Sequence, residues 1–160
     1  MAIRIERAAE RDIPAIVRLV RRLAEYEKLA HAMVSTEDDF RKALFGPQRH
    51  AEALLAFAGD APVGFALYFY NFSTFLGKRG IYLEDLFVEP EYRGQGIGKA
   101  LLERLARVGK DEDCGRMEWA VLTWNQPSID FYRRLGAVAL EDWRTFRLTG
   151  AAFDRLAGHG

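Results

Sequence analysis

The stretch that decides the fold is "EYRGQGIGKALLERLA", residues 91–106. Glycine occupies the alternate positions 94, 96 and 98, and a helix-forming run follows at once. Glycine costs about 0.5–1 kcal/mol relative to alanine inside a helix, because its backbone loses more freedom on folding. We therefore expect a function that requires bare main chain where this helix begins.

An anion is the ligand that such a turn suits best. Backbone N–H groups from Gly94 to Gly98 would point at it, and the helix N-terminus adds roughly half a positive charge. Arg93 and Lys99 would supply formal charge beside a phosphate. The alternative is a tight turn that only needs positive φ values. Three alternate glycines between an arginine and a lysine favour anion binding.

Two other phosphate-binding patterns do not fit. A Walker loop needs Gly-Lys-Ser/Thr, and here Ala100 follows Gly98 and Lys99. The dinucleotide fingerprint G-x-G-x-x-G opens the first strand-to-helix turn of a Rossmann half. Here the spacing is G-x-G-x-G and it comes late in a short chain. What remains is a strand, a bend containing Pro90 and a glycine-rich turn into a helix.

The composition predicts an ordinary globular domain over residues 1–160. Its 23 basic and 23 acidic residues balance, which argues against a nucleic-acid partner. No apolar run approaches the ~20 residues that cross a bilayer, so we expect no membrane partner. The first residues lack an apolar signal core, and Cys114 has no second cysteine to pair with. We therefore expect a cytoplasmic protein. The three histidines lack metal-ligand spacing, so no metal is predicted.

Outward from the glycine turn, the apolar patterns predict a mixed sheet covered by helices. Residues 2–7 alternate as a strand does, and residues 13–24 have helical spacing. Further elements are predicted in chain order: a helix from Ser35 or Thr36 to Gly46, a hairpin turning at Gly59 and Asp60, a strand over 81–88, the helix after the glycine turn, a strand over 116–125, a short helix over 126–136, a strand over 143–150 and a weak helix over 151–158.

The sequence RGQGIG, residues 93–98, resembles the acyl-CoA loop Q/R-x-x-G-x-G/A of the GCN5-related N-acetyltransferases (GNAT superfamily). Residues 82–102, 124–137 and the early "LAEYEKL" (23–29) are similar to the diamine (spermidine/spermine) acetyltransferase branch. The resemblance implies an α/β fold with a mixed, mostly antiparallel sheet that is flanked by helices and splayed at the acyl-CoA site. It also implies a homodimer.

The activity that the resemblance implies is acetyl-CoA-dependent transfer of an acetyl group directly to a primary amine. The acceptor would be a small diamine, a polyamine or a lysine analogue such as thialysine. Two rival functions remain: acetylation of a protein N-terminus or lysine, and non-catalytic binding of acyl-CoA by a regulatory domain.

The resemblance also implies roles for individual residues. Backbone groups of Leu86, Phe87 and Val88 would meet the pantetheine arm, and Tyr132 would protonate the departing thiolate. Without the resemblance, the better interpretation of Tyr132 is an aromatic residue at the edge of the core, whose hydroxyl finds a partner. The remaining implied cofactor-binding residues are Arg93, Gly94, Gln95, Gly96, Ile97, Gly98 and Lys99 around the pyrophosphate, with Asn125 and Ser128 at the start of the next helix.

The implied amine site is acidic and aromatic, and comprises Tyr26, Glu27, Glu84, Asp85, Trp119 and Glu141. An alkylammonium ion has a pKa of about 10.4 and must lose a proton before it attacks a thioester, which a nearby carboxylate can accept. Glu84 and Asp85 are consecutive in a strand, so their side chains should point to opposite faces unless a bulge intervenes. We favour Glu84 as the base or electrostatic anchor and give Asp85 a supporting part.

Overall fold

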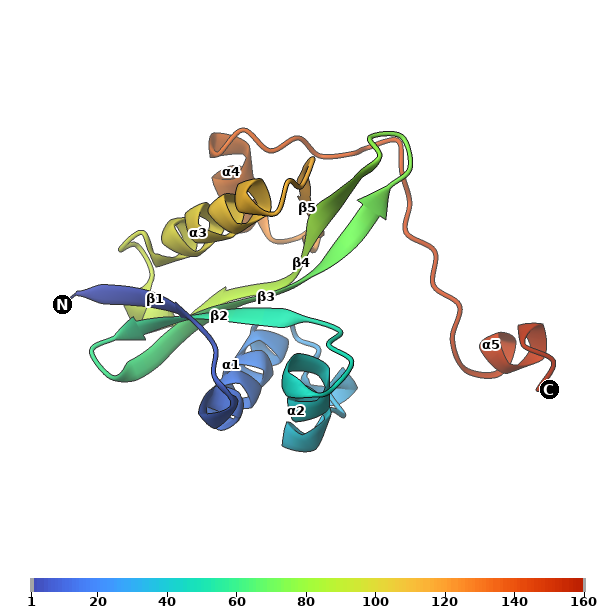
Figure 1. The fold of residues 1–160 in the computed structure, drawn as a ribbon, viewed down its shortest axis with the longest axis horizontal. Coiled ribbons are helices and arrows are strands. Elements are labelled where there is room, and N and C mark those ends of the chain that lie inside the picture. Colours follow the sequence, from blue (N-terminus) through green and yellow to red (C-terminus); the bar gives the residue numbers. More distant parts are fainter. Residues whose placement is uncertain (1, 160) are drawn as a thin grey trace. The chain divides into compact units, whose positions relative to one another are not determined.

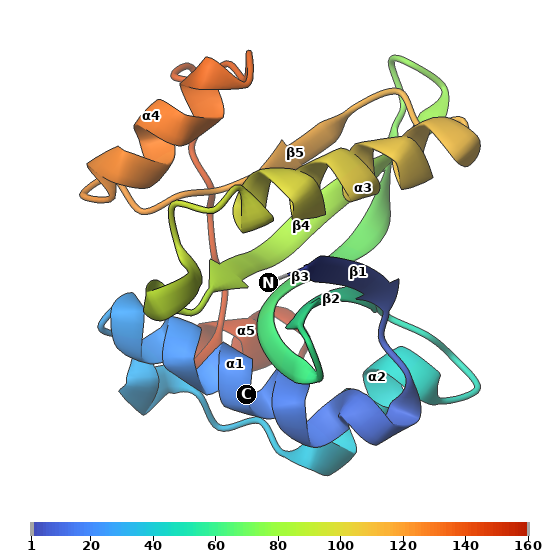
Figure 2. The same cartoon turned by 90° about the vertical axis from the view of Figure 1, so that its left-hand side faces the viewer.

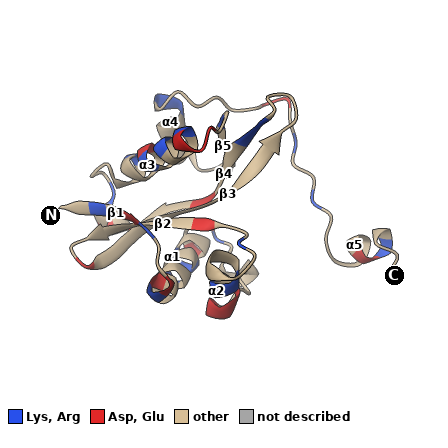
Figure 3. Cartoon of the chain, viewed as in Figure 1, with Lys and Arg blue, Asp and Glu red and all other residues tan. Residues whose placement is uncertain are grey.

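The computed structural model describes residues 2–159. It divides into two compact units, one ending at Ala120 and the other starting at Val121. Acidic and basic residues are interspersed along the helices and strands, in keeping with the zero net charge of the sequence (Figure 3). Within residues 2–159 no helix has both the length and the apolar character required to cross a membrane.

The first unit is built on a sheet whose strands follow one another in chain order. Neighbouring strands run antiparallel, except that the last pair is parallel, which confirms the mixed and mostly antiparallel sheet. Across the described residues the five strands are β1 (Ile3–Arg7), β2 (Glu52–Ala58), β3 (Ala61–Ser73), β4 (Lys78–Val88) and β5 (Met117–Trp119).

Helices cover both faces of this sheet (Figures 1 and 2). The helices α1 (Ile13–Tyr26) and α2 (Glu37–Phe45) lie on one face, and α3 (Ile97–Asp111) lies on the other. Short 3-10 turns precede α1, follow it and follow β4: η1 (Glu10–Asp12), η2 (Ala30–Ala32) and η3 (Pro90–Tyr92).

Local sequence explains where these helices begin. Pro14 stands in the first turn of α1, where its missing N–H costs nothing. Thr36 caps α2: its Oγ1 accepts from the Asp39 N–H at 3.3 Å, and the Asp39 carboxylate accepts from the Thr36 N–H at 2.8 Å. Both helix starts agree with the sequence prediction.

The core between α1 and the sheet is apolar and closed. Ile13, Ile16 and Leu19 of α1 have no exposed surface, and they pack with Leu55 and Phe65 of the sheet. Because the apolar positions of α1 recur at helical spacing, burying them fixes which face of the helix meets the strands. The last turn of α1 is thereby held beside the end of β4, with which it forms the candidate site.

The second unit contains α4 (Gln126–Arg134) and α5 (Gly150–Leu156). The strand predicted over 143–150 is wrong, because residues 143–149 form no regular structure. The strand predicted over 116–125 is shorter than expected, since only Met117–Trp119 pairs with β4. A strand exists through its ladder of hydrogen bonds to a neighbour, and an alternating sequence alone does not supply that neighbour.

Candidate active site

A bulge interrupts β4 at Glu84. Leu67 of β3 pairs with Asp85, and the next residue, Tyr68, pairs with Leu83. Glu84 is therefore an extra residue with no register partner on β3, which is the definition of a β-bulge. By the sequence prediction, Glu84 and Asp85 could share one face only if a bulge intervened, and the structure has that bulge.

The bulge turns Asp85 toward the face that α1 covers. Phe87 belongs to the core beneath α1, and Asp85, two residues earlier in the strand, shares its face. Glu27, just beyond the end of α1, adds a carboxylate near Asp85, and its negative charge contributes to raising the pKa of Asp85.

Glu84 lies on the same face as Asp85. The rings of Tyr82 and Phe69 are 5.2 Å apart, and Phe69 continues the α1-facing series of Phe65 in β3. Glu84, two residues after Tyr82, therefore also faces this side. The charges of Glu84 and of Glu27, just beyond the end of α1, both act on Asp85, so three carboxylates gather on the side of the sheet that carries the rings of Tyr82 and Phe69. Carboxylates and aromatic rings both attract an alkylammonium ion.

The three carboxylates differ in solvation. Asp85 is half-buried, and burial raises its pKa to about 7, with smaller contributions from the charges of Glu84 and Glu27. Burial also raises the pKa of Glu27, which is half-buried just beyond the end of α1. Glu84 is exposed. Asp85 is thus a carboxylate of this cluster with a pKa near neutral pH.

Beyond the bulge, one edge of β4 is open. The parallel pairing with β5 ends where Leu83 meets Trp119, so no strand of the described chain pairs with that edge from Glu84 to Val88. Leu86 and Phe87 lie in this segment, as does Val88, whose carbonyl accepts from the Arg93 side chain. Here the sheet is open next to the acidic cluster, in agreement with the predicted splay.

The glycine turn follows directly. Gly94 and Gly96 have φ of +78° and +80°, a left-handed conformation that strains any residue with a Cβ. Gly96 is the N-cap of α3 and no side chain caps the helix, so the first N–H groups of the helix have no side-chain partner. The N–H groups of Ile97 and Gly98 belong to this first turn, as does that of Lys99, whose ammonium is 3.7 Å from the Glu103 carboxylate.

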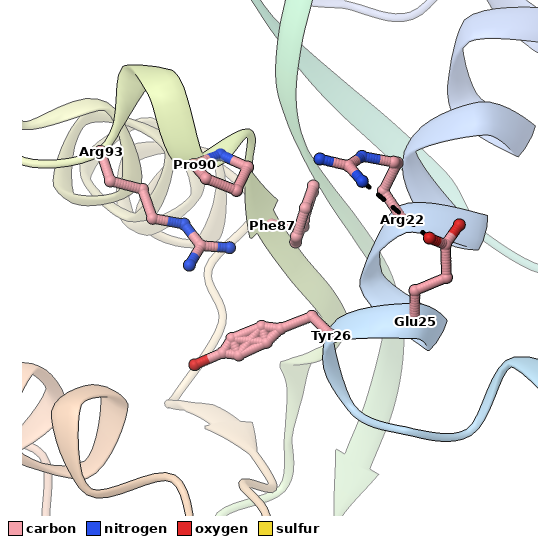
Figure 4. Close-up of a pocket in the computed structure, with 6 residues that line it drawn as sticks. All are labelled: Arg22, Glu25, Tyr26, Phe87, Pro90 and Arg93. Carbon is pink, nitrogen blue, oxygen red and sulfur yellow. Dashed lines mark ion pairs between the residues drawn. The ribbon is translucent and has the colours of Figure 1, made fainter.

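A cavity of about 270 Å³ lies between the last turns of α1 and the end of β4 (Figure 4). Its wall includes Tyr26, which is one of the predicted amine-site residues. It also includes Phe87 and Arg93, which are two of the predicted cofactor-site residues. The other lining residues, which the sequence analysis missed, are Arg22, Glu25 and Pro90. The available signal was that Arg22 precedes Tyr26 by four residues and so shares its helix face.

The remaining predicted residues belong to the second unit or border it. Asn125 is the N-cap of α4, and its side-chain oxygen accepts from the Ser128 N–H at 3.3 Å. Tyr132 is half-buried, with its ring 5.5 Å from that of Phe131. Trp119 is half-buried at the end of β5, and Glu141 is exposed. The contribution of these residues to one site stays a prediction.

Comparison with known proteins gives the family. The model of the "Acetyltransferase (GNAT) family" matches residues 15–137. The chain is 42% identical over 165 residues to a "Thialysine N-epsilon-acetyltransferase" of Bos taurus, covering 96% of each protein. It is 36% identical over 153 residues to the "Spermidine/spermine N(1)-acetyltransferase-like protein 1" of Homo sapiens, covering 89% of this chain and 22% of that protein.

A solved structure shares the fold of this chain. An integron cassette protein of V. cholerae superposes with a TM-score of 0.82 over 98% of both chains, at 26% identity. The chain therefore belongs to the GNAT acetyltransferase family and is an N-acetyltransferase of its diamine acetyltransferase branch.

Proposed function

We propose that this protein transfers an acetyl group from acetyl-CoA to a primary amine of a small cationic molecule, a diamine, a polyamine or a lysine analogue such as thialysine. One observation carries the proposal: the bulge places two consecutive carboxylates, with Glu27, beside the open edge of β4. The anion-binding turn follows the same strand, so a cation and an acyl-CoA would be held next to each other.

Asp85 accepts the proton of the amine, directly or through a water molecule. Its half-buried carboxylate has a pKa of about 7, so a large fraction is ionised at neutral pH and yet binds a proton more readily than an ordinary aspartate. Exposed Glu84 attracts the cation and holds it. The sequence analysis favoured the reverse division of roles between these two residues, and the difference in burial is the reason for exchanging them.

The glycine turn and the edge of β4 hold the co-substrate. The first N–H groups of α3, with Lys99, suit the pyrophosphate, and the unpaired edge at Leu86 to Val88 suits the amide groups of the pantetheine arm. Bound acetyl-CoA supplies an activated thioester. Gly96 keeps the turn free of a Cβ: one built there meets no atom within 4 Å, so the space is open.

Tyr132 protonates the departing thiolate. A phenol with a pKa near 10 can donate to a thiolate, whose conjugate acid has a pKa near 8.5 in cysteine. Comparison of Tyr132→Phe with wild type tests this role, with kcat expected to fall by about 10²-fold or more while acetyl-CoA affinity is kept. An unchanged kcat would remove Tyr132 from the mechanism.

The decisive experiment measures CoA release with a panel of acceptors: thialysine, lysine, spermidine, short diamines, a lysine peptide and a peptide with a free N-terminus. We expect turnover with one or more of the small amines. Turnover confined to the peptides would favour a protein acetyltransferase, and tight acetyl-CoA binding without any turnover would favour the regulatory domain.

The proposed state is a homodimer in the cytoplasm, with residues 1–160 as one domain. The family match crosses the boundary between the two units, which supports a single domain. Exposed apolar side chains support self-association: Phe72 and Phe75 in and beside the β3–β4 hairpin, and Val138, Leu140, Trp143, Phe146 and Leu148 after α4. Light scattering on the purified protein measures the oligomeric state directly.

A further inference from the structure

The side chain of Arg93 points back toward α1 and β4, where it has three neighbours. Its Nε donates to the Val88 carbonyl at 2.9 Å. Its guanidinium carbon is 4.8 Å from the centroid of the Tyr26 ring and 5.3 Å from that of Phe87 (Figure 4). One planar group therefore connects the end of α1, the open edge of β4 and the first residue of the glycine turn.

A second arginine makes the reciprocal connection from the helix to the turn. Arg22 of α1 donates to both carboxylate oxygens of Glu89 at 3.3 Å, and that carboxylate is largely buried. The Glu89 N–H donates to the Val63 carbonyl at 2.8 Å, which fixes the turn to the sheet. The segment from Val88 to Arg93 is thus held to α1 by one link from each side.

We propose that Arg93 is a positioning residue, which fixes the geometry of the glycine turn and of the Val88 carbonyl through its planar shape rather than binding phosphate by its charge. The inference rests on the proposed function, because it assumes an acyl-CoA at this turn. A guanidinium can face two rings and donate through Nε at the same time. An ammonium group carries the same charge but lacks that plane and that donor.

Tyr26 belongs to the predicted amine site, while Arg93 begins the predicted cofactor loop. Their contact gives the two halves of the reaction a shared wall. Weakening it should disturb the placement of the acyl arm even when the donor has no pyrophosphate. A direct phosphate ligand would instead matter only for donors that carry phosphate. This difference separates the two roles of Arg93.

The test compares Arg93→Lys, Arg93→Met and Lys99→Met with two donors, acetyl-CoA and S-acetylpantetheine, which lacks the nucleotide and its phosphates. We expect kcat/KM of both Arg93 variants to fall about tenfold with either donor. For each variant, the losses measured with the two donors should agree to within threefold. Lys99→Met should lose clearly more activity with acetyl-CoA than with S-acetylpantetheine, because only the first donor carries the pyrophosphate. Arg11→Lys, at an exposed arginine of η1, is the matched control.

An Arg93→Lys variant with wild-type activity toward acetyl-CoA would overturn the proposal, as would Arg93→Met with wild-type activity toward S-acetylpantetheine. Tyr26→Leu provides a second measurement in case the Arg93 variants do not fold. It should impair use of S-acetylpantetheine, and an unchanged kcat/KM would likewise overturn the proposal. Failure of the wild type to bind acetyl-CoA would instead remove the proposed function, and this inference with it.

Discussion

The bulge before the end of β4 and the glycine turn after it suit ligands of opposite charge, and they do so by different means. At the bulge, side chains form the proposed cation site: Glu84 and Asp85 are brought to one face, and burial raises the pKa of Asp85. At the glycine turn, the main chain forms the proposed anion site, because Gly94 and Gly96 adopt positive φ and no side chain caps the start of α3. The proposed cation site thus depends on one extra residue in a strand, and the proposed anion site on the absence of side chains.

The largest effect expected on the cation side is that of Asp85→Asn. Removing the proton acceptor should lower kcat/KM for the amine by about 10²- to 10⁴-fold, with little change in CoA affinity. In the wild type, kcat/KM should rise with pH as Asp85 ionises near pH 7, and the variant should lose this step. Steady-state kinetics between pH 5.5 and 8.5 provides the measurement, with Glu84→Gln as the matched control. A larger loss in Glu84→Gln would return the base to Glu84.

The corresponding substitution at the proposed anion site is Gly96→Val, which should weaken CoA binding. A β-branched residue at φ of +80° is strained, and its side chain would occupy the space offered to the phosphate. CoA affinity should fall by tenfold or more in calorimetry. Gly77→Val is the control, because Gly77 has φ of +65° with equally open surroundings in the β3–β4 turn. Both variants should lose stability, and a similar loss of CoA affinity in both would contradict the anion site.

Deleting Glu84 tests the bulge itself. Leu83 and Asp85 would then follow each other in regular register opposite Tyr68 and Leu67, with the faces of both side chains kept. We expect a folded protein with wild-type CoA affinity and a KM for the amine raised by about tenfold, because one attracting charge is lost. An unfolded deletion variant, judged by circular dichroism, would show that the bulge is required for the fold.

The smallest expected effect is on stability. The pKa of Asp85 is raised in the folded state, so between pH 4 and 7 the folded protein binds more protons than the unfolded chain. Its contribution to stability is therefore full below pH 4 and is lost as the pH rises through 7, at a cost of about 1–2 kcal/mol for this half-buried group. Urea unfolding at pH 5 and pH 8 should show this decrease, and Asp85→Asn should remove it. An equal decrease in the variant would assign it to other groups.

Local signals in the sequence predicted most of the fold of the first unit. Pro14, Thr36 and the glycines of the turn each satisfy a local backbone requirement, and they mark where the helices begin. The strand predicted over 143–150 failed because pairing is a property of two segments, and the sequence of one segment cannot show whether its neighbour is there.

The site was predictable to different degrees on its two sides. Gly94 and Gly96 are visible in the sequence because glycine has a distinctive backbone freedom. The bulge was not, because Glu84 and Asp85 look the same in a regular strand and in a bulged one. Their difference in burial is a property of the folded chain, and no spacing in the sequence reveals it.

The exposed apolar side chains between Val138 and Leu148 have a consequence for the degradation of the protein in the cell. Exposed aromatic side chains in an irregular segment, such as those of Trp143 and Phe146, are what proteases and chaperones recognise. If a second copy covers it, dilution would expose it again, and cellular turnover of the enzyme would then follow its abundance.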